Sequence, residues 1–268
     1  MHKDEIRRDI VVNNWLELQE LLFKDSWDKG IERFRSPFAF RGLSDKDYDL
    51  KTSLIRLGGH FEHMEKHLLR NFRKYSPKGT VPNDLIWHWL AVAQHHGLST
   101  RLLDWTYSPY VAMHFATANV DKYNADGVIW CVNFNQTNQL LPKPLRELLI
   151  DEGSNVFTGE MLGSICKGLQ ELEQLSNGKD FVLFLEPPSL DERIINQFAF
   201  FSLMSDPSLK MDDWLKEHQD LYFRVIIPAK LKWEVRDKLD QVNITERVLY
   251  PGLDGLGAWL RRYYRSQS

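Results

Sequence analysis

The chain has 268 residues, of which 43% are hydrophobic and 26% charged, and its formal net charge is -3 at pH 7. This composition is that of a globular protein with enough apolar mass for a core. It argues against a protein that binds nucleic acid or anionic membrane through its overall charge. The charged first ten residues and the lack of an apolar run of roughly 20 residues predict a cytoplasmic protein with no membrane span.

Helices are predicted where apolar residues recur at spacings of three and four, or where start and stop residues bound a suitable segment. Asn13 or Asn14 is expected to cap the first helix, and Asn83 or Asp84 the third. Pro109 is expected in the first turn of the fourth helix. The predicted helices are residues 9–24, 60–75, 84–96, 108–119, 230–242 and 253–264.

Strands are predicted in segments rich in β-branched and aromatic residues. These segments are 36–42, 126–134, 181–188, the apolar part of 191–203, 221–229 and 244–251. The polar stretch 135–180 is predicted to be helical and to form an insertion or lid over the core. The pattern predicts one α+β domain over residues 1–268, with a short-stranded mixed or antiparallel sheet surrounded by helices.

The sequence contains two patterns of possible metal ligands, and neither predicts a metal ion. The two cysteines, Cys131 and Cys166, lie far apart without a zinc-ligand spacing, so buried, reduced thiols are expected. His60, His63 and His67 recur on one side of the second predicted helix. The charged residues between them indicate a solvated helix face rather than three converging ligands.

The first candidate site residue is Arg41, in the tripeptide Phe40-Arg41-Gly42 at the end of a predicted strand. A guanidinium group presents five donors in a fixed fork and is suited to phosphate or carboxylate. The structural alternative is a salt bridge from Arg41 to Asp104 or Asp254, and Arg41 alone favours that alternative.

Residues 94–106 form the densest polar segment of the chain, with two imidazoles, a hydroxyl pair, an arginine and a carboxylate. The imidazoles suit acid/base roles, and the start of the following helix favours an anion. In the structural alternative, Arg101 pairs with Asp104 and the histidines bond to backbone carbonyls. The candidate residues here are His95, His96, Ser99, Thr100, Arg101, Asp104 and Thr106.

Three later segments add further polar candidates. Arg193, Asn196 and Gln197 precede an apolar strand, where Gln197 is either an orienting donor or a bracket for the backbone. Glu246 lies in a Thr-Glu-Arg segment, and Asp254 lies in a Pro-x-x-Asp-Gly sequence typical of an ordinary turn. The sequence contains no GxxxxGK[ST], GxGxxG, HExxH or GxSxG motif, which argues against the enzyme classes that those motifs mark.

Together these segments resemble the FRG-domain family, named for its Phe/Tyr-Arg-Gly motif. The residues that carry the resemblance are FRG at 40–42, AQHHGLSTRLLDWTYSPYVAMHFA at 93–116, RIINQFAFF at 193–201 and TERVLYPGLDGL at 245–256. It spans about residues 10–262. Leu43 stands where glutamine commonly follows FRG, and Phe198 where glycine commonly follows Gln197. Both changes remove polarity or backbone freedom and imply a shifted or weakened activity.

The order of motifs is also similar to that of ADP-ribosyltransferases, which implies a related fold and NAD as the substrate. In that likeness Arg41 holds the pyrophosphate, Ser99 and Thr100 fix the ribose, and Glu246 stabilises the charge that develops as nicotinamide leaves. Asp104 and Glu192 are alternative carboxylates. The FRG resemblance further implies a role in bacterial or phage defence or in toxicity.

Two other functions stay open. One is a non-enzymatic module that binds an anionic ligand or a nucleic-acid end through Arg41, Arg101, Gln197 and the histidines. The other is a nuclease-like hydrolase with His95 or His96 as the acid/base group and Arg101 on the phosphate. A protein or a nucleic acid is accordingly the expected partner, and a membrane is not.

Overall fold

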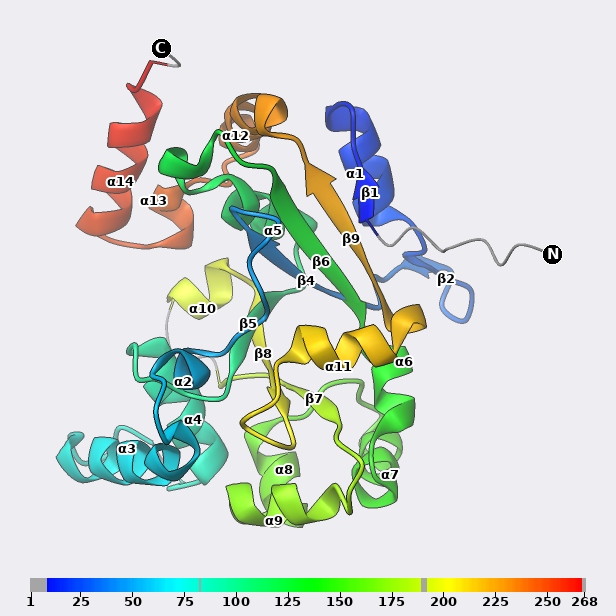
Figure 1. Cartoon of the computed structure of the whole chain (residues 1–268), viewed down its shortest axis with the longest axis vertical. Coiled ribbons are helices and arrows are strands. Elements are labelled where there is room, and N and C mark those ends of the chain that lie inside the picture. The colour runs from blue at the N-terminus through cyan, green and yellow to red at the C-terminus, as the bar shows by residue number, and fades with distance from the viewer. Residues whose placement is uncertain (1–8, 82, 189–191, 267–268) are drawn as a thin grey trace.

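A computed structural model describes residues 9–81, 83–188 and 192–266 of the chain. Its main feature is a seven-stranded sheet with the order β1-β9-β6-β4-β5-β8-β7, in which β1 pairs in parallel with β9 and the other pairs are antiparallel. This arrangement confirms the predicted α+β fold with a mixed sheet surrounded by helices (Figure 1). The strands are β1 (Asp9–Val11), β4 (Phe38–Leu43), β5 (Leu103–Thr106), β6 (Gly127–Asn133), β7 (Val182–Leu185), β8 (Ala199–Met204) and β9 (Tyr222–Ile227), and a separate ribbon joins β2 (Trp27–Asp28) to β3 (Arg33–Phe34).

Fourteen α-helices and four short 3-10 helices surround the sheet within the described ranges. The α-helices are α1 (Trp15–Phe23), α2 (Ser53–Arg56), α3 (Phe61–Tyr75), α4 (Ile86–His95), α5 (Pro109–Thr117), α6 (Phe134–Thr137), α7 (Lys143–Asp151), α8 (Gly159–Ile165), α9 (Leu169–Leu175), α10 (Glu192–Asn196), α11 (Met211–Glu217), α12 (Lys232–Gln241), α13 (Glu246–Leu249) and α14 (Leu253–Tyr263). The 3-10 helices are η1 (Val120–Lys122), η2 (Asn138–Leu140), η3 (Gln219–Leu221) and η4 (Ala229–Leu231).

One face of the sheet carries a continuous apolar layer from β9 to β7. Because successive side chains of a strand alternate between faces, Trp105, Trp130, Phe184 and Phe200 all belong to this layer. Helix α11 covers it with Trp214 among others. The aromatic residues that the composition predicts therefore fill this side of the core.

Two separate groups of helices cover the opposite face. Helices α1, α5 and α12 pack on β4, β6 and β9, in a core that includes Phe40 and Ala112. Helices α3, α4, α7, α8 and α9 pack on β7 and β8, in a core that includes Trp87 and Leu203. Figure 1 shows the first group in the upper part of the molecule and the second in the lower part. The two groups leave β5 between them.

Most predicted elements are confirmed, including α5 with Pro109 at its start and the helical content of 135–180. The segment 244–251 was predicted as a strand, and this was wrong. The Thr245 hydroxyl accepts a hydrogen bond from the backbone N–H of Val248, and this cap starts helix α13. The third helix also begins without the predicted side-chain cap, because Asp84 instead accepts from the indole N–H of Trp89.

The first predicted helix begins later than expected. Residues Asp9–Val11 pair with β9 as a strand, and Asn14 then caps α1 by accepting from the N–H of Glu17. Helices in the described ranges are too short or too polar to cross a bilayer.

The packing of α5 on β4 generates the first prediction. Gly42→Ala should lower the free energy of unfolding by about 3 kcal/mol, because an added methyl group cannot be accommodated against rigid backbone. The new Cβ would lie 1.9 Å from the carbonyl oxygen of Ala112 in α5. Urea denaturation followed by tryptophan fluorescence measures the change. Gly257→Ala is the matched control, since Gly257 lies in α14 with open space around its Cα, and this change should be neutral or stabilising. Equal stabilities of the two variants would contradict the close approach.

Candidate functional site

A pocket of about 380 Å³, lined by both charged and apolar side chains, lies over β5 between the two groups of helices. Its floor includes Asp104 and Thr106 of β5 with Ala199 and Phe201 of β8. Its walls come from β4, the end of α4, the loop after β4, and α10. The wall residues are Phe40, Arg41, Gly42, Leu43, Ser44, Tyr48, Gln94, His95, Phe115, Arg193, Ile194 and Gln197.

The three residues of the FRG tripeptide have distinct roles. Phe40 is fully buried in the core beneath α5. Gly42 allows the backbone of α5 to approach β4 so closely that no side chain fits between them. Arg41, between them, contributes its side chain to the pocket. The tripeptide thus joins a core anchor and a close backbone contact to one charged group in the site.

The guanidinium group of Arg41 lies where β4 and β5 separate. Phe40 pairs with Thr106, and this is the single register pair between the two strands. Beyond it, Nη1 of Arg41 donates to the backbone carbonyl of Asp104 and lies 3.8 Å from the Asp104 carboxylate. The Nε of Arg41 is buried without a hydrogen-bond partner among the described residues. Burial lowers the pKa of Arg41, and the charge of Asp104 opposes this shift.

Asp104 is oriented by a chain of hydrogen bonds from α4. The side-chain amide of Gln94 donates to both carboxylate oxygens of Asp104, at 3.2 Å each. The amide oxygen of Gln94 accepts from the hydroxyl of Thr100 at 2.6 Å, which fixes which end of the amide faces the carboxylate. The Asp104 side chain is nevertheless 58% exposed, so the pocket holds an oriented, accessible carboxylate.

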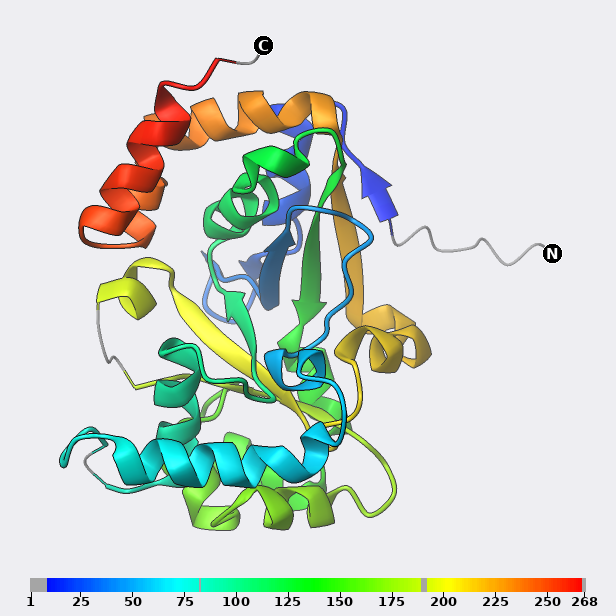
Figure 2. The same ribbon diagram turned by 60° about the vertical axis from the view of Figure 1, so that its left-hand side comes forward.

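The wall formed by α10 is attached to the C-terminal helices. The amide N–H of Gln197 donates to the carbonyl of Leu249 at 2.9 Å, and the hydroxyl of Thr106 donates to the carbonyl of Gln197 at 2.7 Å. Arg193 lies over the ring of Tyr250, 5.1 Å from its centroid. Figure 2 shows α10, in yellow, below the orange and red helices α13 and α14. Gln197 therefore acts as the predicted bracket and also lines the pocket.

The structure brings Arg41, His95, Asp104, Thr106 and Gln197 to this pocket. Two further candidates of the segment 94–106 do not line this pocket. His96 lines a different, apolar groove beside α3, and Thr100 reaches the site only through Gln94. Ser99 is not among the residues that line the pocket. The sequence also did not identify Tyr48 and Phe115 as pocket residues. Phe115 lies within the motif 93–116, but an apolar residue of a helix gives no sign that it lines a site.

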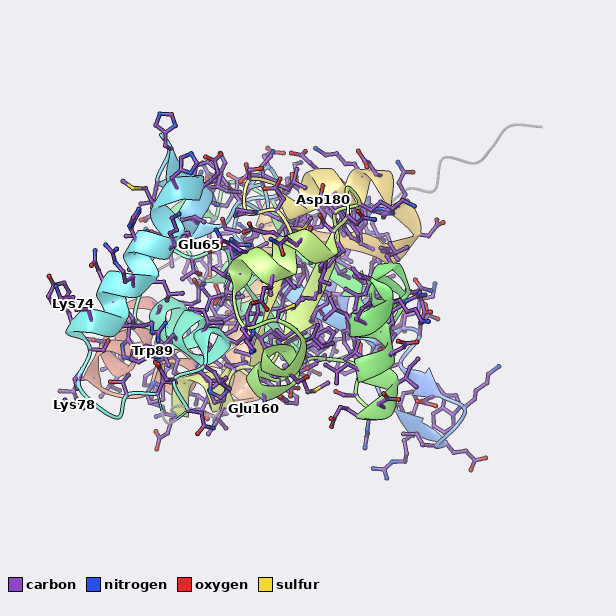
Figure 3. The ribbon with its side chains drawn as sticks, turned by 90° about the horizontal axis from the view of Figure 1, so that it is seen from below. Glu65, Lys74, Lys78, Trp89, Glu160 and Asp180 are labelled. Carbon is purple, nitrogen blue, oxygen red and sulfur yellow. The ribbon has the colours of Figure 1, made fainter. Side chains whose placement is uncertain are left out.

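Arg101 is part of a buried ion cluster, and its partners are not Asp104, as the structural alternative had it, but Glu65 and Glu173. Its guanidinium binds Glu65 of α3 through Nε and Nη2, and Nη2 also binds Glu173 of α9 at 2.7 Å. Glu65 lies on the side of α3 that faces α9 (Figure 3). Arg101 is 3% exposed, and its charge is matched by these two carboxylates. It therefore ties two helices of the lower group together.

Glu246 is likewise part of a buried ion cluster and does not line the pocket. Arg262 of α14 donates to both of its carboxylate oxygens, at 2.7 and 2.8 Å, and Arg236 of α12 lies 3.4 Å away. Asp240 adds a second carboxylate, so two cations face two anions. Burial alone would raise the pKa of Glu246, but the hydrogen bond from Arg262 and the charge of Arg236 lower it to about 2.

Phe198, which follows Gln197, has a φ of +47°. A side chain is strained in this left-handed conformation, which explains why glycine suits the position. Here the ring of Phe198 packs on Tyr107, with a centroid distance of 5.1 Å, and its carbonyl accepts from the Tyr107 N–H. These contacts hold the strained residue next to Gln197.

No cluster of three or more histidine, cysteine, aspartate or glutamate residues with metal-site geometry occurs in the described part of the chain. All three histidines are exposed, as the interleaved charges predicted: His60 directly before α3, and His63 and His67 on the helix. Cys131 and Cys166 are both buried free thiols.

The fold and the pocket together describe an α+β protein with a polar, arginine-containing site. Residues 36–125 match the family model of the FRG domain. The chain therefore contains an FRG domain, which supplies β4 with Arg41, the Gln94–Asp104 segment and α5. The comparisons with curated proteins and with solved structures found no match.

The ion cluster of Glu246 generates a prediction on stability. Glu246→Gln should destabilise the protein by about 3 kcal/mol at pH 7, because it leaves buried arginines without a matching charge. The lowered pKa of Glu246 means that its contribution is full above its ordinary pKa near 4.5 and is lost as the pH falls from there towards about 2. The difference between wild type and variant should therefore shrink over that pH range in urea denaturation. A difference that is independent of pH would contradict the ionised state of the cluster.

Proposed function

We propose that the pocket around Arg41 binds a small anionic ligand of the nucleotide class. The observation that carries this proposal is the incomplete pairing of Arg41. Among the buried arginines, Arg101 and Arg262 each bind two carboxylate side chains through short hydrogen bonds. The third, Arg236, lies within 3.6 Å of two carboxylates, those of Glu246 and Asp240. Arg41 instead is held by one backbone carbonyl, and its nearest carboxylate is 3.8 Å away and exposed.

This arrangement leaves N–H groups of the Arg41 guanidinium available to donate hydrogen bonds to a ligand. Buried charges are normally paired, and a phosphate or carboxylate is the group that a guanidinium fork binds best. Arg193 adds a second positive charge on the same pocket, against the single negative charge of Asp104. The half-buried ring of Phe115 provides apolar surface for a ligand ring. The pocket volume falls in the range of small-molecule sites.

Calorimetric titration with ADP, NAD and adenosine tests this proposal. ADP and NAD should bind and adenosine should not, and Arg41→Ala should weaken binding at least about tenfold because charge-assisted hydrogen bonds are lost. Arg41→Lys should recover only part of the affinity, since lysine lacks the fork. Arg70→Ala removes an exposed arginine of α3 outside the pocket and is the matched control.

Two outcomes would contradict the proposal. One is equal binding by Arg41→Ala and wild type. The other is a folded wild-type protein that binds none of the phosphorylated ligands while Arg41→Ala merely melts at a lower temperature. The second result would assign Arg41 a structural role at the junction of β4 and β5.

Asp104 favours NAD cleavage as a second candidate function. Its carboxylate is oriented by Gln94, accessible, and 3.8 Å from Arg41, so the ribose of a dinucleotide held by Arg41 through its pyrophosphate would lie within reach of it. In this reaction the bond between ribose C1′ and the nicotinamide nitrogen breaks, and its electron pair leaves with nicotinamide. The carboxylate stabilises the positive charge on C1′ until water or an acceptor group attacks and releases a proton. Asp104 then takes the role that the sequence assigned to Glu246.

Nicotinamide release from NAD separates the two carboxylates. Asp104→Asn should reduce the rate about a hundredfold, because the charge on C1′ loses its stabilising anion. Glu246→Gln, assayed where circular dichroism shows it folded, should keep most of the rate, since Glu246 lies outside the pocket. Loss of activity only in Glu246→Gln would contradict this assignment. No release by the wild type would exclude NAD cleavage, and nucleic-acid cleavage lost in His95→Ala would favour the hydrolase alternative.

A further inference from the structure

The outer side of helix α14 carries exposed apolar side chains. The helix lies at the edge of the molecule in both ribbon views (Figure 1, Figure 2). Its buried residues, Gly255 and Arg262, share the side that packs on the rest of the protein. On the opposite side, Leu253 is 83% exposed and Leu260 39%, and Tyr264, directly after the helix, is 80% exposed. One apolar side of α14 is therefore open to solvent.

The spacing on this side is that of a seam between two packed helices. Four residues follow one another at intervals of four, three and four, which is the a and d pattern of a coiled coil. They are Leu253, Gly257, Leu260 and Tyr264. Gly257 has open space around its Cα, so it forms a notch between its two leucine neighbours on the seam.

This order of residues is complementary to itself when it is reversed. In an antiparallel pair of α14 helices, Leu253 of one copy lies level with Tyr264 of the second, and Gly257 lies level with Leu260. The side chain of Leu260 then fills the notch over Gly257 of the second copy, and Leu253 packs on the Tyr264 ring. Each contact occurs twice, as a two-fold symmetric interface requires.

The charges beside the seam favour the same arrangement. Asp254 and Arg261 are exposed and lie seven residues apart, so they share one flank of the seam. In an antiparallel pair this flank meets its own copy in reversed order, so Asp254 of each copy faces Arg261 of the other. A parallel pair would instead place this flank against the apolar flank of Leu256 and Tyr263, and the charges would not meet.

From this self-complementarity we propose that the outer side of α14 is the interface of a symmetric dimer of this chain, in which two α14 helices pack antiparallel. The apolar seam supplies the driving force, and the two ion pairs set the orientation. The helix has only 11 residues. The interface therefore belongs to the weak class of less than about 1,200 Å², and the dimer forms at concentrations on the order of 100 μM. The proposal does not depend on the function of the Arg41 pocket.

Sedimentation velocity at protein concentrations from about 5 to about 300 μM tests the assembly. The wild type should shift from the 31.6 kDa monomer to a particle of twice that mass. Leu260→Glu should stay monomeric throughout, because it places a charge in the apolar seam. Leu16→Glu is the matched control, since Leu16 is an exposed leucine of α1, and it should dimerise as the wild type does. Circular dichroism checks that both variants fold.

Charge exchange tests the antiparallel geometry. Asp254→Arg and Arg261→Asp should each weaken the dimer at least about tenfold, because each change brings like charges together across the interface. A mixture of these two variants should form a heterodimer of about wild-type stability, since every charge then meets its opposite. A misfolded variant or a different kind of partner would not produce this recovery.

Three results would overturn the proposal. The first is a wild type that stays monomeric at the highest concentration, which would leave the outer side of α14 to a different partner. The second is a dimer that persists in Leu260→Glu. The third is a mixture of the two charge variants that does not recover although each variant alone is impaired, which would exclude antiparallel pairing.

Discussion

The contact between the backbones of β4 and α5 is the constraint on which the candidate site depends. With no side chain at Gly42, the carbonyl of Ala112 lies where a Cβ would otherwise be, and α5 sits low on the sheet. Phe40 and Ala112 then pack in one core. Strand β4 pairs with β5 only at Phe40 and separates from it beyond that residue. Arg41 occupies that divergence. A motif of three residues thereby links packing, strand geometry and the charge in the pocket.

The pocket is a consequence of how one face of the sheet is covered. Two helix groups pack on its two ends, each around its own core, and β5 lies between them with Asp104 and Thr106 facing outward. Each group is tied by buried ions, Arg101 with Glu65 in the lower group and Arg262 with Glu246 in the upper. These ion pairs hold the two walls of the pocket, and the short bonds of Arg101 and Arg262 to two carboxylates each distinguish them from Arg41.

The C-terminal helices contribute to the site although they do not line it. Gln197 and Asn196 of the α10 segment donate to the carbonyls of Leu249 and Val248, at the end of α13. Helix α13 in turn is held by the ion pair of Glu246 with α14. Helices α13 and α14 thereby hold Gln197, and with it one wall of the pocket, in position.

The sequence by itself determined the fold class, most of the helices and strands, and the segments that carry the site, because periodicity, capping residues and the FRG tripeptide are local. The sequence could not decide whether an individual polar residue lines the pocket or forms a structural ion pair. The charged residues Arg41, Arg101 and Glu246 all lie in polar motifs. Their roles depend on partners that are distant along the chain, which is Glu65 for Arg101 and Arg262 for Glu246. The short α13 was misassigned as a strand for a related reason: its apolar residues suit both structures, and the cap at Thr245 decides. Only the tertiary structure decided which charges are paired, since pairing depends on which helices meet.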